Sequence, residues 1–397
     1  MYKKYNKFIL AFFAIMIITT LIIVSNILLN KTSKTKYNQL DNTDKKMLDD
    51  LSKIYEEFDK NSDELWNENY KLNKMPIILI RTNKDKGILK KYAFAINVNE
   101  IENSLFSKEI SIPKNLNLPK VYRISKFDIN MFKTLMPSNF GTLNIDENQI
   151  FYFKYYPKMI TNPDLYFDFS SFLLHESFHI YNQSKWTYDK VGDGEYIENY
   201  PVNKENYALI GLEFKLLDKC MESKNKNDIN KFLKQWTEVR TYRYKKWPQL
   251  INETNTEAIE GTARYIEYKY SNLTNGKLTV LATKEKPYHV TFSYAFDCIA
   301  GKKGVSPSYL ERSIKYETGS ALGLIMDKLG ISWKNKIEDS PTKNGKTQYE
   351  ILKDYYKILY KDINSEEIKQ IEDENNYKEL LKKGQSIVNI INENNSK

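Results

Sequence analysis

The segment SSFLLHESFHIYNQ contains the residues with the clearest capacity for chemistry in this chain, His175, Glu176 and His179. They form the pattern H-E-x-x-H. On a helix, positions i and i+4 lie on the same face, so both imidazole rings can bind one metal ion. Glu176 then lies beside the metal without binding it. Its carboxylate can take a proton from a water molecule that the metal activates and pass it to a leaving amine.

This pattern is informative because the chain has only three histidines in 397 residues. With that composition, chance alone gives the pattern in roughly two chains per thousand. The other interpretation is a pair of ordinary histidines on a helix. A helix over 166–184 is predicted independently of the motif, since Phe172, Leu173 and Phe178 are apolar and no Gly or Pro interrupts the segment.

A catalytic zinc site of this kind needs a third protein ligand and keeps one position open for water. The metzincin pattern would place Gly at position 182 and His at position 185, where this chain has Asn182 and Lys185. The remaining histidine, His289, could in principle complete the site. Otherwise the ligand is a glutamate from a later helix, and the candidates are Glu198, Glu257 and Glu260.

Glu260 is the favoured third ligand. Glu198 is followed by Asn-Tyr-Pro, which is poor for the rigid helix that should present a ligand. Glu260 lies inside a predicted helix, and Gly261 follows it. The missing side chain of Gly261 lets another backbone or the metal-binding helix come close. We therefore expect one Zn²⁺ per chain, bound by His175, His179 and Glu260, with Glu257 and Glu198 as alternatives to Glu260.

With the downstream segment Glu260-Gly261-Thr262-Ala263-Arg264-Tyr265, the histidine motif resembles the gluzincin zinc metallopeptidases. In their aminopeptidase branch the third ligand lies in a similar N-E-G-F-A-x-Y segment. Tyr316-Glu317-Thr318-Gly319 resembles the Y-x-K-G segment of that branch, whose tyrosine stabilises the oxyanion. The resemblance covers about residues 165–330 and implies a zincin-like catalytic domain that acts on peptide or protein substrates. The gap from His179 to Glu260 is longer than in that branch, and the chain has no G-x-M-E-N segment.

Tyr316 also makes chemical sense on its own. Attack on a peptide carbonyl builds negative charge on its oxygen, and a phenol O–H aimed at that oxygen contributes roughly 3 kcal/mol in comparable sites. The alternative is a tyrosine packed in a core, and His289 could supply the same donor from another loop. Arg240 and Arg243 precede the predicted ligand helix. They could bind a substrate carboxylate or form a solvated basic helix face.

The N-terminal run from Phe8 to Leu29 is almost wholly apolar over 22 residues, long enough to cross a bilayer as a helix. Lys3, Lys4 and Lys7 precede it and favour a cytoplasmic N-terminus. We expect a single-pass anchor in the cell membrane with the catalytic part outside the cytoplasm. The alternative is a cleaved signal peptide and a secreted protein.

Composition excludes several classes of protein. Apolar residues make up 41% and charged residues 28% of the chain, which is typical of a globular protein and not of a disordered one. The net charge of +9 is spread along the chain without a nucleic-acid motif, so no nucleic-acid partner is expected. Two cysteines, Cys220 and Cys298, allow one disulfide or two buried thiols.

The elements that must position the motif follow an α+β order: a sheet first, then helices. A helix from Met47 and another capped by Ser62, carrying Leu65 and Tyr70, come first. Strands are predicted at 76–82, 91–98, 121–125 and 148–156. Helices are predicted at 166–184, 204–222, 228–245, 253–270, 307–329, 347–361 and 365–395. Gly330 should end the helix before it, and the last helix should break near Gly384.

We divide the chain into an anchor at 1–30, a linker at 31–42, a helix and sheet part at 43–160, a metallopeptidase helical part at 161–335 and C-terminal helices at 336–397. The strand at 148–156 is the candidate edge strand for pairing with extended substrate. The predicted function is a membrane-anchored, extracytoplasmic zinc metallopeptidase. The alternative is a catalytically inactive cell-surface binding or structural protein on a peptidase-like fold.

Overall fold

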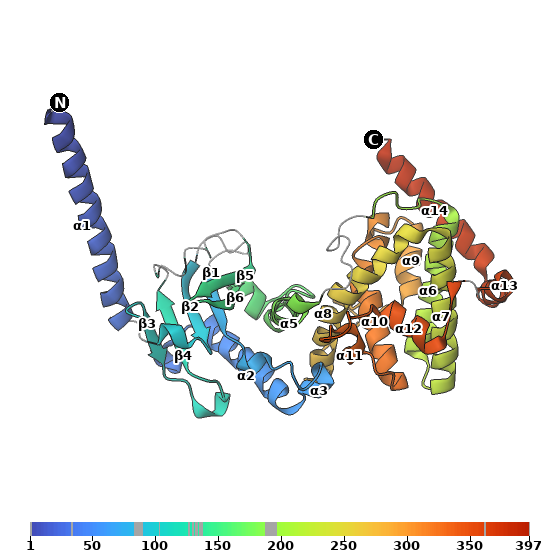
Figure 1. Cartoon of the computed structure of the whole chain (residues 1–397), viewed down its shortest axis with the longest axis horizontal. Coiled ribbons are helices and arrows are strands. Elements are labelled where there is room, and N and C mark those ends of the chain that lie inside the picture. Colours follow the sequence, from blue (N-terminus) through green and yellow to red (C-terminus); the bar gives the residue numbers. More distant parts are fainter. Residues whose placement is uncertain are drawn as a thin grey trace. The chain divides into compact units, whose positions relative to one another are not determined.

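The computed structural model of the chain describes residues 2–32, 35–82, 90–102, 104–125, 128, 131, 134, 138–186, 197–360 and 363–396. These residues form an α+β structure with helices and one six-stranded sheet (Figure 1). The chain divides into two compact units. The first unit comprises Met1–Asp63 and Glu68–Tyr181, and the second comprises Glu64–Asn67 and Asn182–Lys397. The division into five segments stays a prediction.

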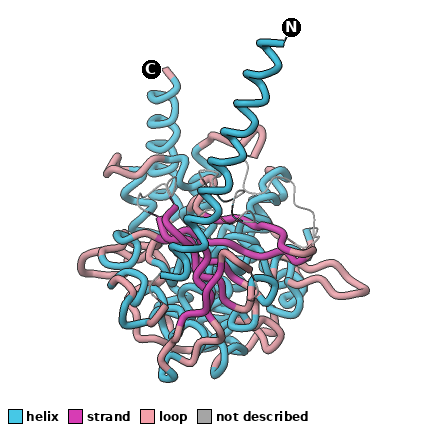
Figure 2. Tube along the Cα trace, turned by 90° about the vertical axis from the view of Figure 1, so that its left-hand side faces the viewer, coloured by secondary structure: helices cyan, strands magenta, loops and turns pink. Residues whose placement is uncertain are grey.

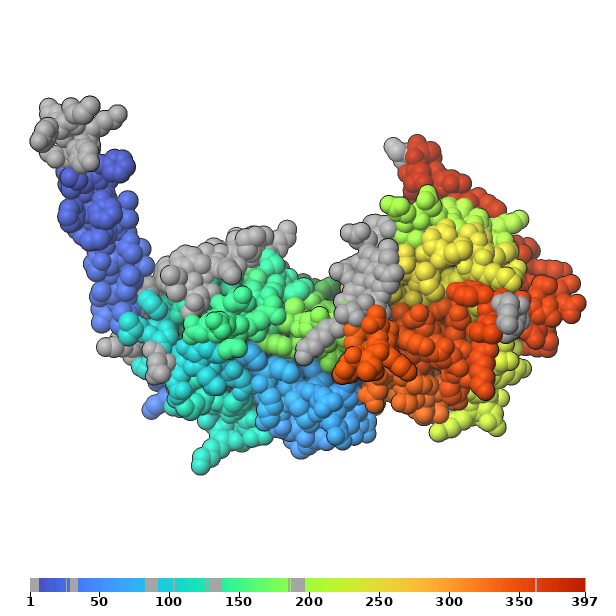
Figure 3. Space-filling model, in the orientation of Figure 1, coloured from blue at the N-terminus to red at the C-terminus, as the bar shows by residue number. Residues whose placement is uncertain are grey.

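The N-terminal helix α1 runs from Tyr2 to Thr32 and confirms the predicted apolar helix. Its window Lys7–Ser25 has a mean hydropathy of 2.8, and none of that window is buried. Large apolar side chains between Phe8 and Leu28 are exposed, and Figure 3 draws this part of the chain in blue. Length and composition allow this helix to be a membrane span or a signal sequence.

The sheet of the first unit is drawn in magenta in Figure 2. Its strands are β1 (Ile77–Thr82), β2 (Lys90–Ile96), β3 (Ser107–Ile110), β4 (Val121–Ser125), β5 (Phe140–Ile145) and β6 (Asn148–Tyr155). Their order is β3-β4-β2-β1-β6-β5, and only β1 and β6 pair in parallel. The four predicted strands are confirmed. β3 and β5 were not predicted because one is short and polar and the other contains Gly141.

The prediction that 148–156 is an edge strand is wrong. β6 pairs with β1 over residues 151–155 on one side and with β5 over residues 148–153 on the other, so it lies inside the sheet. The outer strands of the described sheet are β3 and β5. Sequence order misled the prediction, because the strand nearest to the metal-binding helix along the chain lies inside the sheet.

One face of the sheet is covered by α2 (Asn42–Lys60) and α5 (Phe169–Tyr181). Asp44 of α2 accepts hydrogen bonds of 2.6 Å from the hydroxyls of Tyr92 and Tyr155. The ring of Phe153 lies 5.9 Å from that of Phe169 and 5.5 Å from that of Phe172. Alternate strand residues point the other way and form a separate apolar cluster, which includes Ile78, Ile80, Ala93, Ala95, Ile124, Leu143, Ile150 and Tyr152.

Local backbone geometry explains where α5 begins. The predicted helix was to start at residue 166, but Tyr166 has a φ of 66°, in the left-handed region that helices do not use. Asp168 follows, and its carboxylate accepts the backbone N–H groups of Ser170 and Ser171 at 3.1 Å. This is an N-cap, so the helix starts at Phe169. After Tyr181 the chain continues in a short 3-10 turn, Gln183–Lys185.

Two other predictions in the first unit have mixed outcomes. The helix predicted from Met47 is confirmed as part of α2. The helix predicted from Ser62 is a single turn, α3 (Ser62–Leu65), and Tyr70 lies outside it. A further short helix, α4 (Pro157–Thr161), leads from β6 toward α5.

The second unit is helical. Its helices are α6 (Lys204–Glu222), α7 (Lys226–Lys246), α8 (Glu253–Leu273), α9 (Phe292–Ala300), α10 (Ile314–Leu329), α11 (Lys334–Ile337), α12 (Gln348–Tyr356), α13 (Ser365–Glu374) and α14 (Tyr377–Asn395). α8 packs mainly on α10, and α6 packs mainly on α7 and α14. Gly330 ends α10 with a φ of 71°, as predicted. Cys220 and Cys298 are free thiols.

Three predicted helix boundaries in this unit are wrong. The predicted helix 307–329 is a 3-10 turn, Pro307–Leu310, followed by α10. α12 stops at Tyr356 because Lys357 has a φ of 57°. The last helix breaks at Asn376, whose φ is 54°, and not at Gly384. Gly384 lies within α14, where a Cβ atom would come 2.3 Å from the carbonyl oxygen of Lys204.

The crossing of α8 and α10 depends on two glycines. A Cβ atom on Gly261 would lie 2.6 Å from the Cα of Gly319, and one on Gly319 would lie 2.3 Å from the carbonyl oxygen of Glu257. The expectation that another backbone approaches Gly261 is therefore confirmed, and the backbone is that of α10. This close crossing fixes α8 against α10 directly beside Glu260.

Gly319→Ala should destabilise the protein by about 1–3 kcal/mol, because the added methyl group must push apart two backbones. The gain of roughly 1 kcal/mol in helix propensity does not offset this. The measurement is urea unfolding of the full chain in detergent, monitored by circular dichroism. Gly301→Ala is the comparison, since its Cβ would lie 3.1 Å from the carbonyl oxygen of Asp297, a contact that a shift of a few tenths of an ångström relieves. Equal stability of the two variants would contradict the tight crossing.

Candidate metal centre

Helix α5 presents both histidines of the motif. The ring centroids of His175 and His179 lie 4.7 Å apart at an interplanar angle of 77°. Leu173, Leu174 and Phe178 are fully buried and hold the other side of the helix in the core. The apolar side chains therefore determine which face of α5 carries the imidazoles, as the sequence pattern predicts.

Glu176 follows His175 on α5 and is also nearly buried. Glu176 is only 8% exposed, and His175 is 6% exposed. A carboxylate in such a place is shielded from bulk water, so its interactions with nearby charges and protons are stronger than on a surface. This is the setting that an acid–base residue needs.

Helix α8 presents Glu260, whose side chain is 17% exposed. Two residues of the second unit lie against its carboxylate. The hydroxyl of Tyr316 donates a hydrogen bond to it, and Nη2 of Arg312 lies 3.7 Å from Oε1. Burial and the negative charge of Glu260 raise the pKa of Tyr316, so its hydroxyl keeps its proton.

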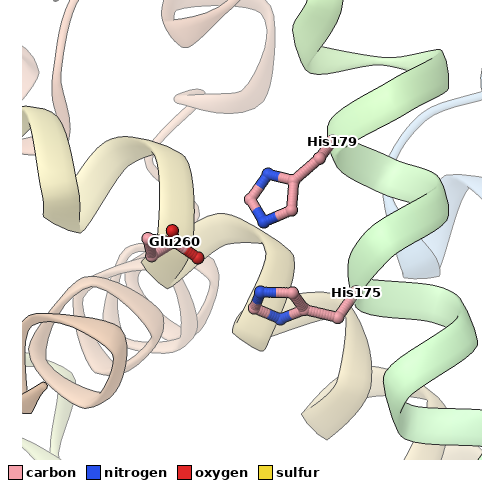
Figure 4. Close-up of side chains that lie close together, drawn as sticks. All are labelled: His175, His179 and Glu260. Carbon is pink, nitrogen blue, oxygen red and sulfur yellow. The ribbon is translucent and has the colours of Figure 1, made fainter. Parts of the chain in front are cut away.

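His175, His179 and Glu260 form a group that could hold a metal ion. One ligand atom from each lies within 4.8 Å of the others. Figure 4 shows the two imidazole rings and the carboxylate directed toward one another. Two imidazole nitrogens and one carboxylate oxygen are ligand types that zinc accepts.

The competing third ligands lie elsewhere. Both oxygens of Glu257 are engaged by Arg240, at 3.1–3.2 Å, and the hydroxyl of Thr318 donates to Oε1 at 2.6 Å. Glu198 is exposed and is not part of the group. His289 is not part of it either, and its Nδ1 lies 2.5 Å from the carbonyl oxygen of Val280.

Both interpretations of Arg240 and Arg243 are wrong. The two arginines are 1% and 0% exposed, so they form no solvated face and meet no substrate. They belong to a buried ionic cluster, which we define as Arg240, Arg243, Lys315, Glu213, Glu253 and Glu257. Three cations face three carboxylates, so the cluster is formally neutral. It joins α6, α7, α8 and α10 and thereby holds the helix that carries Glu260.

The sequence did not single out Arg312 or, in the buried ionic cluster, Glu213, Glu253 and Lys315. One signal was present. Of the 60 basic residues of the chain only six are arginines, and four of these, Arg240, Arg243, Arg264 and Arg312, lie on or near α8. Arginine is favoured over lysine where a fixed, forked partner for a carboxylate is needed.

Comparisons of the chain with protein-family models, with curated proteins and with solved structures found no match. The resemblance to gluzincins therefore rests on the motifs alone and stays a prediction.

Proposed function

We propose that this protein is a membrane-anchored, extracytoplasmic zinc metallopeptidase with a zincin-like catalytic domain. The observation that carries the proposal is the convergence of His175, His179 and Glu260, with a nearly buried Glu176 on the same helix as the histidines. Zinc would be held by the three convergent residues, one ion per chain. Helix α1 would anchor the protein in the cell membrane, or would be removed as a signal sequence to give a secreted form.

The proposed reaction is hydrolysis of a peptide bond. Zinc bound at this site would act as a Lewis acid and activate water at neutral pH. Glu176 takes a proton on its carboxylate as water attacks the carbonyl carbon, and it then delivers this proton to the departing amine nitrogen. Both steps need a carboxylate that is shielded from bulk water and held in place, as Glu176 is on α5.

Tyr316 is proposed to stabilise the negative charge that develops on the carbonyl oxygen. Its hydroxyl already donates a hydrogen bond at Glu260, so it lies within reach of the same site, and its raised pKa keeps the donor protonated. A small rotation of the side chain would redirect the O–H from Glu260 to the substrate oxygen.

Metal analysis tests the site. The full chain purified in detergent should contain about one zinc per chain, and Glu260→Ala should lose most of it because only two ligands remain. Glu198→Ala is the control, since Glu198 is an exposed glutamate outside the group, and it should keep the zinc. If Glu260→Ala keeps the zinc and Glu198→Ala loses it, then Glu198 and not Glu260 is the third ligand. No zinc uptake by the natural chain would leave a cell-surface binding or structural protein as the better proposal.

A further inference from the structure

Arg312 precedes α10, in the turn that links the 3-10 turn Pro307–Leu310 to this helix. Its guanidinium carbon lies 5.7 Å from the centre of the Tyr316 ring, and its Nη2 lies 3.7 Å from Oε1 of Glu260. The side chain is 42% exposed. A positive, planar group thus stands beside the carboxylate of the metal group and remains accessible to a molecule from solution.

Arg264 of α8 also lies near Tyr316 but in a different environment. Its guanidinium carbon lies 5.8 Å from the Tyr316 ring, but its side chain is only 14% exposed. Nη1 bonds Oε2 of Glu267 at 2.6 Å, and Nε lies 3.8 Å from Oε1 of Glu317. Its charge is therefore balanced within the protein. The side chain of Arg312 is the more exposed of the two, at 42% against 14%.

The charge balance changes when a divalent ion is bound. Glu260 carries one negative charge, and a zinc ion carries two positive charges. With zinc on Glu260 and the carboxylate of Glu176 beside it, these formal charges cancel, and Arg312 then leaves one positive charge in excess, less than 4 Å from the carboxylate of Glu260. A carboxylate brought by the substrate would offset this excess, and the forked guanidinium is suited to bind it through two hydrogen bonds.

The geometry points to Arg312 as the recognition site for a carboxylate of the substrate, placed close to the bond that is cut. This inference rests on the proposed function. It narrows the substrate class to peptides that carry a negative charge near the scissile bond, either a free C-terminal carboxylate or the side chain of an acidic residue. Tyr316, which lies beside both Arg312 and Glu260, would separate the carboxylate from the reacting carbonyl.

A binding measurement tests this inference without requiring turnover. Two pairs of fluorescein-labelled peptides are compared. The first pair is Gly-Phe-Leu-Ala with a free C-terminal carboxylate and the same peptide as its C-terminal amide. The second pair is Gly-Phe-Glu-Ala amide and Gly-Phe-Gln-Ala amide, which differ only in the charge of one side chain. Binding to the full chain carrying Glu176→Gln, in detergent, is followed by fluorescence anisotropy with added zinc and with chelator. At least one charged peptide should bind about 10-fold more tightly than its neutral partner. The pair that shows the difference identifies the source of the carboxylate.

Arg312→Gln should remove this preference and leave the affinity for the neutral peptides and the zinc content unchanged. Lys302→Gln is the control for loss of one positive charge, because Lys302 is an exposed residue paired with Glu393, and it should keep the preference. Arg312→Lys should keep part of it, since the charge remains and the fork is lost.

Three results would overturn the inference. The protein that retains Arg312 could bind charged and neutral peptides equally well, or the preference for charged peptides could survive Arg312→Gln. The third result is that Arg312→Gln loses zinc. The last result would make Arg312 a positioning residue for Glu260. Failure of the proposed function looks different. In that case the chain takes up no zinc, and the peptide comparison in chelator still reports whether Arg312 selects carboxylates.

Discussion

Glu176→Gln is expected to lower peptide hydrolysis by about 10²–10⁴-fold while the protein keeps its zinc. Glutamine has nearly the shape of glutamate, so α5 and the two histidines should stay in place. An amide cannot take up the proton of the attacking water, and it cannot return a proton to the departing amine. Hydrolysis of a mixed peptide library, followed by mass spectrometry, and zinc content measured on the same samples give both quantities.

The control for this experiment is Glu198→Gln, the same substitution at an exposed glutamate outside the metal group. It should leave both the rate and the zinc content unchanged. If Glu176→Gln hydrolyses peptides as fast as the natural chain, then Glu176 is not the acid–base residue. If it loses zinc together with activity, its role is to support the metal ligands.

The group that could hold a metal ion could be predicted because the types and spacing of its residues are distinctive. Two histidines four residues apart must share a helix face, and Gly261 marked a close approach next to Glu260. In the structure, one ligand atom each of His175, His179 and Glu260, the favoured choice among three glutamates, lies within 4.8 Å of the others. Each of these signals lies within a few residues along the chain, whereas the choice of Glu260 over Glu257 and Glu198 could not be settled by local patterns.

Long-range pairing could not be predicted in the same way. The position of β6 inside the sheet depends on β1, more than 60 residues earlier in the chain, and no local pattern encodes that partner. Arg240 and Arg243 resembled a solvated face because arginine is rarely buried unless it is paired. Their partners Glu213 and Glu253 lie on other helices, so only the folded structure reveals the pairing.

Arg243→Met is expected to destabilise the protein by about 3–5 kcal/mol, the typical consequence of removing one partner from a buried ion pair. Arg243 is fully buried. Its Nε donates to Glu213 Oε1 at 2.7 Å, and its Nη2 donates to Glu253. Methionine fills much of the space and leaves two buried carboxylates with less positive charge. Urea unfolding of the full chain in detergent measures the change.

Lys302→Met provides the matched control, because both members of the Lys302–Glu393 pair are more than half exposed. Such exposed pairs contribute only about 0–1 kcal/mol, so this variant should unfold almost like the natural chain. A loss in Arg243→Met no larger than in Lys302→Met would mean that the buried ionic cluster does not stabilise the second unit.

The pH dependence of this loss tests its electrostatic origin. Burial alone would raise the pKa of Glu253, but the positive charges of Arg243, Lys315 and Arg240 outweigh burial and lower it well below its ordinary value of 4.5. A carboxyl group whose pKa is lowered by folding stabilises the folded state at pH values above its ordinary pKa. This stabilisation is lost as the pH falls toward the folded-state pKa.

Without Arg243 the pKa of Glu253 is lowered less, so the variant has less of this stabilisation to lose. The difference in unfolding free energy between the natural chain and Arg243→Met should therefore narrow as the pH falls below about 4.5. A difference that stays constant from neutral pH into this acidic range would assign the loss to packing alone.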